Sequence, residues 1–411
     1  MEPRRESAGD FWEETVDPLL VDWISLILRW AHVMFGIAWI GTSFYFIWLD
    51  GSLRRRAHSQ EGVAGESWMV HGGGFYQVEK YMVAPERLPE ELHWFKYEAY
   101  FTWISGFLLL AVIYYWSAEA FLINPASGLS PALAIAISVG SLILGWLAYD
   151  LLCRSPIGRQ TAILAAAVFL LIVLAAWGYG IAFSGRAAFL HVGAFVGTIM
   201  AANVFFIIIP NQKKTVAALK AGETPDAHLG HQAKQRSFHN TYLTLPVVLM
   251  MISNHYPVLY GREQGALIVA GIVILGGLVR HYFTCKDSGN KDASYPFLIP
   301  AAVATLAVLM AFSSYRPDAA GEGEAVAFAE VQSVIVERCA SCHSARPTDE
   351  DFEEAPGEVV FDTPDDIKKH AQRILTQTVL TDTMPLGNKT GMEPEERQLL
   401  GTWIAQGAPL D

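Results

Sequence analysis

Long apolar stretches alternate with short polar segments over the first three quarters of the chain. Eight of these stretches reach the length of about 20 residues that a helix needs to cross the hydrocarbon core of a membrane. They lie near residues 22–49, 97–117, 131–152, 160–183, 187–210, 241–260, 265–284 and 295–314. Several are rich in Gly and Ala, which permit close helix packing in lipid. The pattern predicts an all-α membrane bundle of about eight spans over residues 1–316.

The pattern changes after residue 316. Residues 317–411 contain 7 basic and 19 acidic residues, whereas the rest of the chain contains 22 of each, so the net charge of −12 comes from this segment alone. Residues 315–325, with Pro317, Gly321 and Gly323, have the composition of a linker. We expect a second, soluble domain over residues 317–411.

The positions of Lys and Arg predict the topology. The loops after the first, third, fifth and seventh stretches hold 15 of these residues, and the loops after the second, fourth and sixth hold 2. Loops rich in Lys and Arg stay in the cytoplasm. Both termini are therefore expected on the outer side of a bacterial inner membrane, with the C-terminal domain in the periplasm.

The C-terminal domain contains the run Cys339-Ala340-Ser341-Cys342-His343. Two cysteines three positions apart and an adjoining histidine are typical of covalent c-type haem attachment, in which the histidine binds the iron. A redox dithiol or half of a zinc site is the alternative, but neither needs His343. Met384 is the candidate sixth ligand, or else an ordinary core methionine. We expect one haem c, with His343 and Met384 as metal ligands.

Residues 322–408 resemble a class I cytochrome c, a small α-helical domain, and residues 394–404 resemble its terminal helix.

Ionisable residues inside membrane spans are costly and are therefore candidates for function. The predicted topology puts one group near the outer ends of the spans: Arg29, His32, His191, Asn254 and His255. A second group falls toward the inner ends: Asn203, Asn211, His239, Asn240, Tyr242, Arg280 and His281. His239 and His255 are about 24 Å apart on one helix and cannot share an iron. A haem b held between His32, His191 and His255 is one use of the outer group, and packed histidines with satisfied hydrogen bonds are the alternative.

The run from His71 to Tyr76 places three glycines between a histidine and two aromatic residues. Glycines allow the backbone to approach a ligand closely, so this loop is a candidate cradle for a flat substrate. A flexible turn with an exposed histidine explains the same residues.

The eight spans, the His71 loop, the runs 236–242 and 253–257 and a C-terminal cytochrome c together resemble the membrane-bound bacterial urate oxidases. The resemblance covers essentially the whole chain and rests mainly on the domain combination. It implies oxidation of urate to 5-hydroxyisourate, with electrons passing through the fused haem to a downstream cytochrome c or terminal oxidase, without hydrogen peroxide formation.

A urate site needs a cation, amides and a base. The cation candidates are Arg29, Arg236 and Arg280; the amides include Asn254, Asn203 and Asn240; the bases are His239 and His71. The competing functions are a quinol-oxidising or other small-molecule-oxidising cytochrome b/c subunit and, less favoured, a transporter. No nucleic-acid partner is expected.

Overall fold

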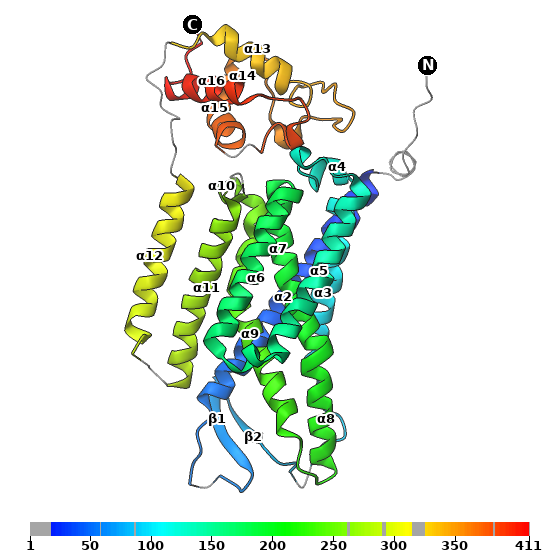
Figure 1. The fold of residues 1–411 in the computed structure, drawn as a ribbon, viewed down its shortest axis with the longest axis vertical. Helices are drawn as coiled ribbons and strands as arrows, with labels where there is room; N and C mark the ends of the chain where they lie inside the picture. Colours follow the sequence, from blue (N-terminus) through cyan, green and yellow to red (C-terminus); the bar gives the residue numbers. More distant parts are fainter. Residues whose placement is uncertain are drawn as a thin grey trace.

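The computed structural model describes residues 18–57, 59–85, 88–260, 264–289, 293–314, 325–380 and 383–410. Long helices stand side by side in a bundle, and a smaller helical unit covers one end of it (Figure 1). We call that end of the bundle the cap end. The opposite end carries a β-hairpin and is called the hairpin end.

The bundle contains all elements up to residue 314. In chain order they are α2 (Pro18–Ser52), β1 (Val63–His71), β2 (Gly74–Tyr81), α3 (Tyr97–Leu110), η1 (Ala111–Tyr115), α4 (Ala118–Phe121), η2 (Pro125–Ser127), α5 (Pro131–Arg154), η3 (Pro156–Arg159), α6 (Thr161–Ala182), α7 (Gly185–Ala202), η4 (Asn203–Ile208), α8 (Ile209–Lys220), α9 (Ala227–Ile252), η5 (Ser253–His255), α10 (Pro257–Tyr260), α11 (Gly265–Ser288) and α12 (Tyr295–Ser314).

Seven helices in the described residues are long and apolar enough to cross a membrane. They are Leu19–Ser52, Tyr97–Tyr115, Pro131–Arg154, Thr161–Ala182, Gly185–Lys220, Gly265–Ser288 and Tyr295–Ser313. The eighth predicted span, 241–260, differs from the structure. Its helix α9 begins at Ala227 and ends at Ile252, and its polar first half keeps it outside this apolar set.

The β-hairpin is a departure from the predicted all-α fold. β1 and β2 pair antiparallel, from Val63 opposite Tyr81 to His71 opposite Gly74. Gly72 and Gly73 form the turn with φ values of 59° and 78°, which suit the tight hairpin turn that right-twisted strands favour. The flanking segments are rich in Val, Phe, Tyr and Trp, residues that favour strands.

The core of the bundle lies between α5, α6, α7, α9 and α11. α7 and its continuation through η4 and α8 are the most buried of the long apolar helices. A side chain at Gly145 of α5 would collide with the ring of Phe195 on α7, so this glycine permits the close approach of the two helices. Several helices also begin as their sequences require: Pro131 opens α5, and the Asp226 side chain accepts from the His228 amide at the start of α9.

The unit over the cap end has its own hydrophobic cluster, centred on Trp403, Ile335 and Leu400. Its elements are α13 (Phe328–Arg338), η6 (Pro356–Glu358), α14 (Pro364–Lys369), α15 (Ala371–Ile374), η7 (Leu375–Val379), η8 (Leu386–Asn388) and α16 (Pro394–Ala405). It contacts the bundle where η8 meets α4 and where η7 meets α10. The predicted linker, including Pro317, Gly321 and Gly323, lies almost entirely outside the described residues.

Candidate functional site

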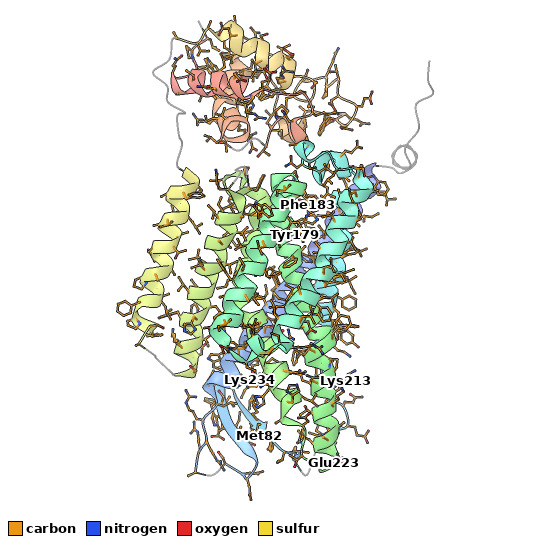
Figure 2. All side chains as sticks on the ribbon, in the orientation of Figure 1. Met82, Tyr179, Phe183, Lys213, Glu223 and Lys234 are labelled. Carbon is orange, nitrogen blue, oxygen red and sulfur yellow. The ribbon has the colours of Figure 1, made fainter. Side chains whose placement is uncertain are left out.

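A cluster of polar side chains lies inside the bundle toward the hairpin end. We call it the inner polar site. It is formed by residues of three segments, α5, η4 and α9: Tyr149, Asp150, Asn203, Arg236, His239 and Asn240. Figure 2 shows Lys234, two residues before the arginine of this cluster, near the hairpin end of the bundle.

Tyr149 is at the centre of the hydrogen bonds in this site. Its hydroxyl lies 2.7 Å from Nδ1 of His239 and accepts from Nδ2 of Asn203 at 3.1 Å. The same Asn203 nitrogen lies 3.0 Å from Oδ1 of Asn240, whose own Nδ2 donates to the Met200 carbonyl at 2.9 Å. These bonds connect α5 and α7 with α9 and orient the imidazole of His239.

Arg236 is held by a buried ion pair. Its Nη2 donates to Oδ1 of Asp150 at 2.7 Å, and its guanidinium carbon lies 4.9 Å from the centre of the Tyr149 ring. Oδ2 of Asp150 accepts from Nε of Arg154 at 2.6 Å. The Asp150 carboxylate therefore forms ion pairs with both Arg154 and Arg236. Of the two arginines only Arg236 is buried, with 2% of its side chain exposed.

Three hydrogen-bonding atoms of the inner polar site have no partner. Nε and Nη1 of Arg236 and Oδ1 of Asn203 are buried and make no hydrogen bond. Buried polar groups are almost always paired in native proteins, because burying one without a partner costs free energy. Two free donors and one free acceptor beside His239 are the features expected of a binding site for a polar, anionic molecule.

The local geometry of η4 positions Asn203. Residues Asn203–Ile208 form a π-helical turn between α7 and α8, a rare conformation that is frequent at functional sites. Asn203 is completely buried and begins this turn. The sequence had identified Asn203, Arg236, His239 and Asn240 as separate candidates. It did not identify Tyr149 or Asp150, although an acidic residue at position 150, four residues before Arg154, is a detectable signal inside a span.

His191 lies toward the cap end and is fully buried. Its Nδ1 donates to the Ala187 carbonyl at 2.7 Å, and Nε2 lies 2.8 Å from the Ser138 hydroxyl. The rings of Tyr179 and Phe183, labelled in Figure 2, lie 5.6 and 4.5 Å from the His191 ring. Both nitrogens of His191 are therefore engaged by the protein.

The other residues predicted for the outer group have separate surroundings, except that Tyr114 contacts both Asn254 and the His191 ring. His32 donates from Nδ1 to the Thr102 carbonyl at 2.9 Å and packs on α3. Arg29 and His255 are exposed. Asn254 accepts from the Arg186 guanidinium and the Tyr114 hydroxyl, each at 3.3 Å. The hydrogen-bond partners of His32 and of His191 have no residue in common.

His71 lies at the tip of the hairpin and is exposed, as is its neighbour Phe75. The glycine run is thus the turn of the β1–β2 hairpin.

Arg280 lies on α11, also toward the hairpin end, and only 5% of it is exposed. Its guanidinium carbon lies 4.8 Å from the centre of the Phe44 ring of α2. The next residue, His281, has its Nδ1 2.7 Å from the Tyr242 hydroxyl of α9. Nε and Nη2 of Arg280 are buried and make no hydrogen bond. Asn211, also predicted for the inner group, donates to Gln232 and to the Leu229 carbonyl and has a structural role between α8 and α9.

In the unit over the cap end, Cys339 and Cys342 follow α13 directly and are not joined by a disulfide. Burial raises the pKa of the Cys339 thiol to about 12, whereas redox dithiols have lowered pKa values. Nδ1 of His343 donates to the Val359 carbonyl at 3.0 Å, which leaves Nε2 for a metal. These residues fit a covalently attached haem.

Met384 is partly buried in the loop before η8, and its carbonyl accepts from Nη1 of Arg397 at 2.8 Å. This bond fixes the loop against α16. Among the described residues, no three His, Cys, Asp or Glu side chains lie close enough together to bind one metal ion.

A cavity of about 220 Å³ near the cap end, between α6, α7, α10 and α11, is lined mainly by apolar residues such as Trp177, Phe189 and Val269. It contains none of the polar residues described above, so it is not the candidate site.

A family model described as "Urate oxidase N-terminal" matches residues 18–312, more than two thirds of the chain. The chain belongs to this family. The match covers all but the last two residues of the bundle, includes the inner polar site and Arg280, and indicates an oxidoreductase that acts on urate. Searches of curated proteins and of solved structures found no match.

Proposed function

We propose that the chain is a membrane-embedded urate oxidase that binds urate at the inner polar site and converts it to 5-hydroxyisourate. The observation that supports this most directly is the set of buried, unpaired atoms on Arg236 and Asn203 within the region that matches the family. The seven long apolar helices support a multi-pass location in a membrane.

Urate at neutral pH is a planar monoanion with both carbonyl acceptors and N–H donors. Nε and Nη1 of Arg236 would donate to urate oxygens, and Oδ1 of Asn203 would accept from a urate N–H. The ion pair with Asp150 fixes the guanidinium before the ligand arrives, which lowers the entropic cost of binding. Charge-assisted hydrogen bonds in a buried site are strong ones.

His239 is the candidate base. In the tautomer with the proton on Nδ1, it donates to the Tyr149 oxygen, and the lone pair of Nε2 is free to accept a proton. The overall reaction balances as follows: the urate monoanion and one water give 5-hydroxyisourate, one proton and two electrons. His239 would take the proton as the electrons leave, and water would add to the oxidised ring.

The electrons require an acceptor, and a c-type haem bound through Cys339, Cys342 and His343 supplies one-electron acceptor chemistry. The Val359 carbonyl would keep His343 in the tautomer that binds iron. Met384 is the proposed sixth ligand, and Arg397 would hold its loop in place. A downstream cytochrome c or terminal oxidase of the respiratory chain would receive the electrons.

The distribution of Lys and Arg supports one orientation. The hairpin end, with Lys213 and Lys234 labelled in Figure 2, would face the bacterial cytoplasm, where urate from purine breakdown is formed. The cap end and its C-terminal unit would face the periplasm.

The test is reduction of the c-type haem by urate under anaerobic conditions, followed by absorbance in purified full-length protein. Arg236→Gln and His239→Asn should each abolish reduction by urate and leave reduction by dithionite intact. Lys234→Gln, on the same helix but exposed, is the matched control and should behave as wild type. Normal urate reduction in both site variants would refute the proposed site. A pyridine haemochrome spectrum then identifies the c-type haem and any b-type haem present.

A further inference from the structure

Arg280 is a second buried cation, and the acidic residue that acts on its charge, Asp287 on the same helix, forms no ion pair with it. Ser288, the last residue of α11, lies eight positions after it, so Arg280 lies about 12 Å inside the hairpin end of that helix. No carboxylate among the described residues forms an ion pair with it. A charge removed from water without compensation is costly, and such charges in proteins are normally paired.

The two free donors of Arg280 lie on the same edge of the guanidinium. Nε–H and the adjacent Nη2–H point in parallel directions, which is the arrangement that binds two neighbouring acceptor atoms at once. The Phe44 ring lies against the guanidinium at 4.8 Å. A ligand at this edge of the guanidinium would therefore be anionic and would present two adjacent acceptors.

The depth of Arg280 argues against a lipid phosphate. A headgroup lies at the membrane surface, whereas Arg280 is enclosed by protein at 5% exposure and more than two helical turns from the end of α11. The Tyr242–His281 hydrogen bond joins α9 to α11 at this level, and α9 carries the inner polar site toward α5 and α7. Arg280 and Arg236 thus lie on different sides of α9.

We propose that Arg280 forms a second anion-binding subsite, which takes the same class of ligand as the inner polar site, a planar oxopurine monoanion. The inference rests on the proposed function for the identity of the ligand. Each chain then holds two urate anions at saturation, one at Arg236 and one at Arg280.

Equilibrium dialysis of radiolabelled urate against purified full-length protein, without oxygen, tests this directly. Wild type should bind two urates per chain, Arg236→Gln one and Arg280→Gln one. Arg280→Lys keeps the charge but loses the paired donors, so its second site should weaken roughly 10- to 100-fold. Lys286→Gln, which removes an exposed charge from the same helix, should bind two.

The outcomes separate the two proposals. One urate per chain, lost in Arg236→Gln alone, would overturn the second subsite and leave the proposed function standing. One urate, lost in Arg280→Gln alone, would keep the Arg280 site and refute urate binding at Arg236. No binding by folded wild type would overturn both.

Thermal unfolding without ligand provides an independent measurement. If the Arg280 subsite binds an anion, Arg280→Met without ligand should unfold at a higher temperature than wild type, because it removes a buried charge that forms no ion pair within the described residues. Urate should then raise the midpoint of Arg280→Met less than that of wild type. A lower midpoint for Arg280→Met, with an undiminished urate effect, would assign the arginine a packing role on Phe44 and refute the subsite.

Discussion

Removing Asp150 and removing Arg236 from their ion pair should lower the free energy of unfolding by unequal amounts. The pair is buried: 2% of the Arg236 side chain and 10% of the Asp150 side chain are exposed. Asp150 has a second cation, Arg154, whose side chain is 54% exposed. Within the described residues Arg236 pairs with no second carboxylate, and two of its nitrogens already lack partners there.

The magnitudes follow from what each substitution leaves behind. Asp150→Asn leaves a buried guanidinium without a counter-charge, which should lower the free energy of unfolding by about 3–5 kcal/mol. Arg236→Met leaves a carboxylate that still pairs with Arg154, so its cost should be about 1–3 kcal/mol. The double variant Asp150→Leu/Arg236→Met should lie near wild type, because replacing a whole buried pair is often neutral.

The assay is unfolding of the purified protein in mixed micelles, with and without urate. Asp150→Asn should gain more stability from urate than wild type, because the anion would then provide the missing counter-charge. Arg236→Met should gain none from urate at this site. If Arg236→Met proves as destabilising as Asp150→Asn, the assignment of Asp150 as the sole compensation for Arg236 is wrong.

Three further outcomes are expected. Gly145→Ala should lower the free energy of unfolding by about 1–3 kcal/mol through overpacking, and so lower the unfolding temperature. Gly140→Ala, on the same helix but with open space around it, should leave the unfolding temperature unchanged. Equal midpoints for the two variants would contradict the close packing of α5 on α7. Hydrogen bonding to Lys389 lowers the pKa of Asp349, so this bond should stabilise the C-terminal unit above the unfolded pKa of about 3.9 and lose its effect as pH falls through the folded value. The calorimetric difference between wild type and Lys389→Gln should therefore shrink below about pH 4, and a constant difference would contradict the pairing. Met384→Ala should keep covalent haem but lower its potential, and an unchanged potential would exclude Met384 as a ligand.

The sequence predicted the helices whose apolar residues are continuous. The stretches 131–152, 160–183 and 265–284 lie within a few residues of α5, α6 and α11. α9 was misjudged at its start, because residues 227–240 carry the polar side chains of the inner polar site and look like a loop. The hairpin was missed because two short strands around Gly72 and Gly73 give a weaker signal than a span.

Predicting the site was harder, because depth along a span is readable from sequence but lateral position is not. Counting residues from each helix end put His32 and His191 at a similar level, yet one packs on α3 and the other faces Ser138 of α5. On the hairpin side, Asn203 and His239 meet because both reach Tyr149, a residue that an apolar stretch does not distinguish from a core tyrosine. Only packing reveals which atoms remain unpaired.

The proposed function places urate and its electron acceptor, the c-type haem, at opposite ends of the bundle. Tyr149 lies 18 residues after Pro131, the first residue of α5, so the inner polar site is about 27 Å from the cap end of that helix. Electrons from urate would then cross most of the membrane toward the cap. Moving one charge across the whole potential changes the free energy by about 2.3 kcal/mol per 100 mV, so an inside-negative potential would favour outward electron movement. In proteoliposomes with the hairpin end inside and urate enclosed, haem reduction should be more complete under an imposed inside-negative potential, and indifference to the potential would place the urate site close to the cap instead.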